Sequence, residues 1–140
     1  MISSKLCFAA TAVIRDNQTN RISAFNILEG LIPLGLPLFL PELSCVTLWE
    51  REVGDAQVIR GTFTVNLDND NLTTTQMHVD FSEVMRSRSI VNISGLVIPR
   101  SGVLRFRFVL ETGATAEYSA EIEAPPPAVA QEAQPVRVPE

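Results

Sequence analysis

The acidic stretch "LDNDNL" contains the residues best suited to hold a cation, Asp68 and Asp70. Calcium prefers carboxylate and amide oxygens, but a calcium loop needs more donors at regular spacing, usually with a glycine and a distant acidic ligand. Leu72 stands where a further ligand is needed, and no glycine follows it closely. Because Asn and Asp also favour tight turns, the stretch predicts a polar hairpin turn without a metal.

The single histidine, His78, is the candidate for general-base chemistry. Asp80 and Ser82 follow at intervals of two, so on a strand all three side chains would lie on one solvated face. Base catalysis also needs a nucleophile and an orienting acid within a recognisable motif, and no motif frames His78. Gly30 and Gly35 are not followed by a helix pattern, which argues against a phosphate-binding loop. We therefore predict no catalytic residue, no cofactor and no enzymatic activity.

The two cysteines, Cys7 and Cys45, each lie in an apolar segment. Two interpretations remain open: buried thiols in a reducing compartment, which we favour, or a disulfide that joins two strands. With one histidine elsewhere, the cysteines do not form a clustered ligand set, so we expect no metal site.

An uncharged apolar segment, "GLIPLGLPLFLP", spans residues 30–41. It has twelve residues, whereas a transmembrane helix needs about 20 apolar residues. Pro33, Pro37 and Pro41 recur every fourth residue, which excludes a helix and argues against a central strand. The segment is therefore expected to be an extended connection that lies against the rest of the protein.

The chain has 140 residues and a net charge of −5, which fits one domain with its own core. Nucleic acids and anionic membranes attract basic surfaces, so this acidic balance argues against both partners. In the N-terminal stretch, cleavage after Ala12 would leave only about six apolar residues before it, fewer than the roughly 7–15 of a signal peptide. We interpret that stretch as a first strand and expect a cytoplasmic protein without a membrane span.

Turn-forming residues recur at short intervals between segments rich in Val, Ile, Phe and Thr, a pattern typical of all-β proteins. One face of "QVIRGTFTVNL" carries Ile59, Phe63, Val65 and Leu67, and one face of "ELSCVTLWERE" carries Leu43, Cys45, Thr47 and Trp49. We predict a single antiparallel β-sandwich of about seven to eight strands over residues 1–123.

The last hairpin can be aligned by its pattern. A three-residue loop at 112–114 would set Leu104 opposite Ile122 on the core side. It would also set Arg105 opposite Glu121 on the exposed side, where such pairs stabilise only weakly. A slip of one residue would turn charges into the core, so we expect a well-specified register.

The composition changes at residue 124, where "APPPAVAQEAQPVRVPE" replaces the β-branched pattern. Such a segment buries too little apolar surface to offset its ordering entropy. Residues 124–140 are predicted to be a disordered tail.

The order of these motifs resembles a group of small bacterial β-sandwich proteins of unknown function. The resemblance covers residues 5–123 and rests on "LCFAATAVIRDNQTNRISAFNILEGL", the proline-containing link, "LSCVTLWERE", "GTFTVNLDNDN" and "NISGLVIPRSGVLRFRFVLE". It implies an immunoglobulin-like sandwich, bacterial or phage-borne, without known catalytic residues. Val103 and Leu104 depart from the group, which more usually has an aromatic residue there.

Within the apolar segment, the leucines expected to face the core are Leu31, Leu34 and Leu36. Leu38, Phe39 and Leu40 cannot all point the same way, so some apolar surface should stay exposed, as at interaction sites. Trp49 is expected to pack in the core unless it faces outward near its strand end.

Our leading hypothesis is a non-enzymatic protein-interaction module that binds a protein partner or a second copy of itself. Its predicted contact residues are Leu36, Leu38, Phe39, Leu40 and Trp49. Two alternatives remain: a small-ligand or carbohydrate binder with a groove at the same residues, and a structural component of a phage or a secretion apparatus.

Overall fold

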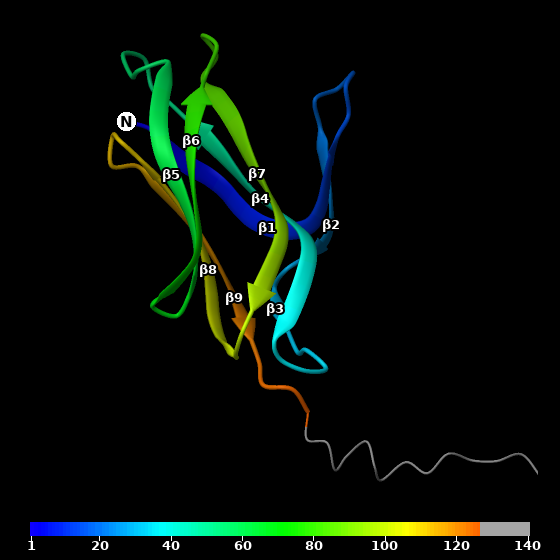
Figure 1. The fold of residues 1–140 in the computed structure, drawn as a ribbon. Coiled ribbons are helices and arrows are strands. Elements are labelled where there is room, and N and C mark those ends of the chain that lie inside the picture. Colours follow the sequence, from blue (N-terminus) through cyan, green and yellow to red (C-terminus); the bar gives the residue numbers. More distant parts are fainter. Residues whose placement is uncertain (127–140) are drawn as a thin grey trace, which may run out of the picture.

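The computed structural model describes residues 1–126 as nine β-strands in two sheets, with no helix among those residues (Figure 1). The strands are β1 (Ser3–Arg15), β2 (Ile22–Ile27), β3 (Gly30–Leu31), β4 (Leu38–Glu50), β5 (Val58–Leu67), β6 (Asp70–Asp80), β7 (Arg86–Ile98), β8 (Gly102–Leu110) and β9 (Thr115–Ile122). The predicted all-β, two-sheet fold is confirmed. The expected seven to eight strands were too few, because β3 has two residues and no alternation to reveal it. Of the predicted tail, residues 127–140 lie outside the described part.

One sheet has four strands in the order β2-β1-β4-β7, and the other has five in the order β3-β9-β8-β5-β6. Every pair of neighbours is antiparallel except β3 and β9, which run parallel. The chain therefore leaves the four-stranded sheet after β2, touches the five-stranded sheet at β3 and returns at β4.

The core lies between the sheets and is formed by every second residue of the long strands. Phe63 and Phe108 sit with ring centroids 4.7 Å apart, and Trp49 meets Phe108 edge-on at 6.3 Å. The predicted core faces of β4 and β5 are confirmed, since Leu43, Cys45, Thr47, Trp49, Ile59, Phe63, Val65 and Leu67 are all buried.

β4 is a central strand in one half and an edge strand in the other. β1 pairs with β4 only from Ser44 to Glu50, and after Ala10 it pairs with β2 instead. Before Ser44, β4 has β7 as its one partner in the described chain. Pro41 lies in this half, where a residue without an N–H is tolerated. The predicted connection therefore ends earlier than expected, since Leu38–Leu40 already belong to β4.

In β4 and β7, side chains point alternately toward the core and toward solvent. This alternation is interrupted at Pro41 and Gly95, which lie opposite each other but do not form a paired position. Leu40 faces the core, yet Glu42, two residues later, is exposed. Gly95 adopts φ 75°, a conformation that favours glycine. A Cβ there would lie 3.5 Å from the Phe39 ring, so that ring lies over the glycine. The pairing keeps its register across Gly95, since Leu40 lies opposite Leu96 and Glu42 opposite Ser94.

The outer face of the four-stranded sheet, which points away from the core, is largely apolar. Cross-strand pairing assigns to it Leu6, Phe8, Ala10, Ala12, Ile14, Phe25, Ile27, Val46, Leu48 and Ile90. Val46 is fully buried although it is outside the core cluster, so other groups on that side must cover it. The turn of the β1–β2 hairpin reaches over this face, where Arg88 of β7 donates a 3.1 Å hydrogen bond to the Asn20 carbonyl.

The hairpin of β8 and β9 has a register two residues away from the predicted one, with Leu104 opposite Ala120. The loop is Glu111–Gly113, since the Leu110 N–H bonds the Ala114 carbonyl. Gly113 at φ 92° ends it, as a three-residue loop of this type requires. A shift of two residues keeps every side chain on the same face of the sheet. The residues predicted to face the core are therefore correct, and the predicted cross-strand partners are wrong.

Candidate functional site

The apolar segment 30–41, called the crossover below, closes one end of the sandwich by touching both sheets. Its start pairs with the end of β9, Gly30 with Glu121 and Leu31 with Ile122. Just before it, Leu28 is buried and donates its N–H to the Ala9 carbonyl of β1. The segment therefore lies against its own domain, as the sequence predicted.

The inward side of the crossover includes most of the predicted contact leucines. Leu38 and Leu40 pair with the buried Ile98 and Leu96 of β7 and pack on the core. Leu36 is half-buried. Leu38 and Leu40 therefore have their main contacts within the domain, and all three side chains remain partly exposed.

The outward side exposes large apolar side chains that sequence reasoning only partly identified. Leu34, expected inside, is 86% exposed, because Gly35 and the prolines turn the chain outward there. Ile32 is 63% exposed and Phe39 is 60% exposed. Val97 of β7, directly opposite Phe39, adds to the same surface. We call Ile32, Leu34, Phe39 and Val97 the crossover face.

The prediction that Trp49 contacts a partner is wrong for this structure. Its side chain is fully buried, with Phe108 against it, because it shares the core face of β4 with Leu43 and Cys45. Within residues 1–126, the indole Nε1 has no hydrogen-bond partner. The position of Trp49 near the end of its strand suggested that its side chain is exposed. However, β4 continues to Glu50, and the next residue, Arg51, is itself buried.

The acidic stretch forms a turn between β5 and β6, as predicted. Arg100 binds both carboxylates, with its Nη2 2.6 Å from an Asp70 oxygen. The pKa of Asp68 lies below its ordinary value. The main cause is a hydrogen bond from the Val103 N–H, and the second is the hydrogen bond from Arg100. No group of metal ligands occurs among residues 1–126. The carboxylates therefore fasten the 99–103 turn to the β5–β6 turn.

His78 lies on the exposed side of β6, opposite Arg60 of β5. The carboxylate of Asp80 accepts hydrogen bonds from the N–H and the hydroxyl of Ser82, so it shapes the turn after β6. The hollow beside His78 is otherwise lined by Val58, Arg60, Gln76 and Met77, none of which is a nucleophile.

The two thiols are free and lie on neighbouring strands. Cys7 is opposite Thr47 and Cys45 is opposite Ala9, so the cysteines are diagonal neighbours on the core face. The Cys45 thiol lowers the pKa of Cys7, and the pKa of Cys45 is raised by its contact with Cys7 and by burial. Diagonal neighbours are about 7–8 Å apart at Cα, beyond the usual span of a disulfide.

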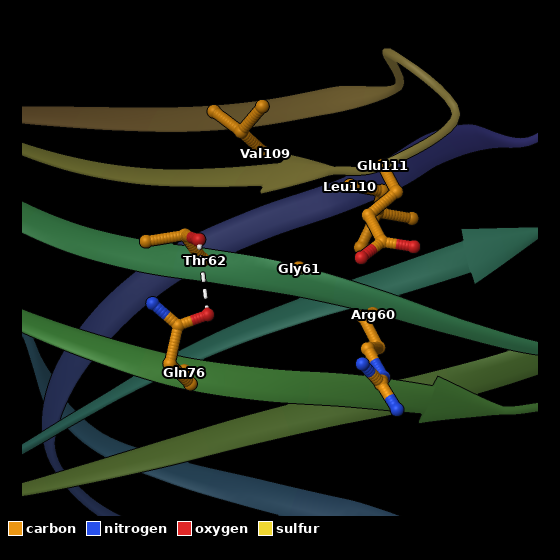
Figure 2. A pocket seen from close by; sticks show the side chains of 7 residues that line it. All are labelled: Arg60, Gly61, Thr62, Gln76, Val109, Leu110 and Glu111. Atoms are coloured by element: carbon orange, nitrogen blue, oxygen red, sulfur yellow. Dashed lines mark hydrogen bonds between the residues drawn. The ribbon is translucent and has the colours of Figure 1, made fainter.

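Four hollows on the surface of residues 1–126 have volumes of about 300–330 Å³ each. The hollow in Figure 2 lies over Gly61 of β5, with Arg60 and Glu111 at one end and Thr62 and Gln76 at the other. Thr62 Oγ1 bonds Gln76 Oε1 at 3.4 Å. The lining of this hollow is mostly polar, whereas pockets that hold small ligands are usually apolar.

Comparison of the chain with protein-family models, curated proteins and solved structures gave no match. Within residues 1–126, no helix has the length and apolar character needed to cross a membrane. Interpretation of the site therefore depends on this chain's own residues.

Proposed function

We propose that this protein is a non-enzymatic interaction module that binds a protein partner through the crossover face. The observation that supports this proposal is the exposure of Ile32, Leu34 and Phe39 in one short segment, by 60% or more each. A single exposed apolar side chain is ordinary, whereas a group of them usually serves contact with another molecule.

The crossover is also anchored well enough to serve as a contact surface. Leu31, Leu38 and Leu40 pack on the core beneath it, and the Glu123 N–H bonds the Leu31 carbonyl. A fixed apolar surface loses little conformational entropy on binding, which favours affinity.

The same proposal includes an immunoglobulin-like relationship and a reducing, cytoplasmic location. The stacking of two mainly antiparallel sheets supports the first, and the free thiols of Cys7 and Cys45 support the second. A sugar-binding groove built on Trp49 has less support, because that ring is buried.

Site-specific photocrosslinking in cells of the source organism tests this function. A photoreactive phenylalanine analogue at position 34 should give a discrete adduct with a partner protein. The matched control is position 53, since Val53 is a solitary apolar residue that is 93% exposed in the β4–β5 loop.

The double substitution Leu34→Asp and Phe39→Asp should abolish the adduct formed from an analogue at position 32. Val53→Asp should leave it intact. Equal adducts from positions 34 and 53, or an adduct that survives the double substitution, would contradict the proposed role of the crossover face.

A further inference from the structure

The edge strand β2 (Ile22–Ile27) is the least protected sheet edge in the described part of the chain. It ends the four-stranded sheet and pairs on one side only, with β1. Two of its side chains, Phe25 and Ile27, are each 49% exposed on the apolar outer face. An exposed apolar edge strand is a template for pairing with another strand.

The other long edge strands are protected in ways that β2 is not. β7 begins with Arg86 and Arg88, and its Ser87 hydroxyl bonds the Asp80 carbonyl of β6. β6, the long edge strand of the five-stranded sheet, begins with Asp70 and ends with Asp80, and polar Thr residues lie between them. β2, with the sequence ISAFNI, has no charge and no proline.

The open side of β2 presents free backbone groups. The Asp16 N–H bonds the Arg21 carbonyl, and bonded positions alternate along an antiparallel pair. The N–H and C=O groups of Ile22 and Ala24 therefore point away from β1. Asn26, at φ 54°, turns its side-chain amide to Thr11 of β1 and so does not cover this edge.

The two ends of β2 carry opposite charges. Arg21 precedes the strand and Glu29 follows it, and both side chains are exposed. Neither has a salt-bridge partner within residues 1–126. Antiparallel pairing of β2 with a second β2 about a two-fold axis sets Arg21 of each copy toward Glu29 of the other.

We propose that two copies of this chain associate through antiparallel pairing of their β2 strands. The partner is a second copy because a two-fold arrangement matches the opposite charges at both ends at once. Each chain has a net charge of −5, so two copies carry a net electrostatic repulsion. The electrostatic repulsion between two copies is smallest where their uncharged β2 edges approach each other. Pairing would join the two four-stranded sheets and bring Phe25 of each copy near the axis.

Sedimentation equilibrium of the full chain, from micromolar to sub-millimolar concentration, tests this inference. The natural protein should fit a monomer–dimer equilibrium. Phe25→Lys places two like charges near the axis and should raise the dimer dissociation constant by more than about a hundredfold. Val58→Lys is the matched control, because Val58 is 58% exposed on the five-stranded sheet, away from β2, and it should leave the constant unchanged.

A charge exchange gives the sharper result. Arg21→Glu and Glu29→Arg should each weaken the dimer by about tenfold, and the double variant should recover it. An equimolar mixture of the two single variants should form heterodimers as tight as the natural dimer. A monomeric natural protein, or no recovery in both the double variant and the mixture, overturns the inference. Since β2 and the crossover face share no residue, Leu34→Asp separates the two proposals: it should remove the crosslinked partner and leave the dimer.

Discussion

The outer faces of the two sheets differ in chemistry although both arise from the same alternation of side chains. On the five-stranded sheet most outward residues of β5, β8 and β9 are polar, with Val58, Val103 and Val109 as exceptions: Arg60, Thr62, Thr64, Asn66, Arg105, Arg107, Glu117, Ser119 and Glu121. On the four-stranded sheet the corresponding positions of β1, β2 and the end of β4 are mostly aliphatic or aromatic. The outer face of the five-stranded sheet is therefore solvated. The outer face of the four-stranded sheet is partly covered by the β1–β2 hairpin and partly exposed.

The difference shows why exposure alone does not identify a contact surface. Val46 is on the outer side and yet fully buried, whereas Ile27, two strands away, is half-exposed. The hydrogen bond from Arg88 to Asn20 holds the hairpin turn on this side. The apolar outer face thus has a closed part at Val46 and an open part along β2.

The largest effect should come from a charge placed on the closed part. Val46→Asp buries an unpaired carboxylate and should lower the free energy of unfolding by more than about 3 kcal/mol. Thr64→Asp, the matched change on the five-stranded sheet, should change it by less than about 0.5 kcal/mol. Urea unfolding followed by tryptophan fluorescence measures both, and similar losses in the two variants would contradict the comparison.

The next largest effect concerns the phase change that turns Phe39 outward. Gly95→Ala forces a side chain into φ 75° beside the Phe39 ring and should cost about 1–2 kcal/mol. Gly35→Ala is the control, since a Cβ there meets nothing within 4 Å. Thermal unfolding of the two variants should separate them, and equal melting temperatures would argue against strain at Gly95.

Acid should weaken the turn contacts on the polar side. The pKa of Asp68 is lowered in the fold from its ordinary 3.8, first by the Val103 N–H and then by Arg100. Its contribution to stability is therefore present above pH 3.8 and is lost as the pH falls through the lower folded value. Asp68→Asn should flatten this acid limb in unfolding curves measured at successive pH values. A limb as steep as that of the natural protein would show that Asp68 does not contribute to it.

The smallest effect belongs to the ion pairs on the five-stranded sheet. Arg107 and Glu117 approach to 3.9 Å, and both are about half-exposed. Arg107→Ala should change the free energy of unfolding by less than about 0.5 kcal/mol, with little dependence on salt. A loss as large as that of Gly95→Ala would mean that the polar face stabilises the fold more than its exposure indicates.

Much of the fold could be predicted because alternation specifies which side of a strand faces the core. The buried faces of β4 and β5 follow directly from residues such as Phe63 and Cys45. Alternation does not specify the register within a face, so Leu104 was assigned a partner two residues away from Ala120. Gly113 carries the missing signal, since a three-residue loop needs its glycine in the last position.

The candidate surface was harder to predict, because it depends on how an irregular segment meets both sheets. Proline spacing showed that residues 30–41 lie against the domain but not which side chains face inward. Leu34 and Leu36 differ by two positions, yet only Leu34 is almost wholly exposed. The openness of β2 also could not be inferred, because strand order is a property of the whole chain.

Pairing of β3 with the last residues of β9 brings the polypeptide out of the sandwich beside the crossover, whereas Met1 lies toward the other end of the molecule (Figure 1). A carrier fused after Pro126 would therefore stand close to the crossover face and could shield it. A carrier fused before Met1 would stand clear, at the cost of the exposed contacts of the terminal ammonium with Glu52 and Asp55. The end chosen for attachment decides which surface remains accessible.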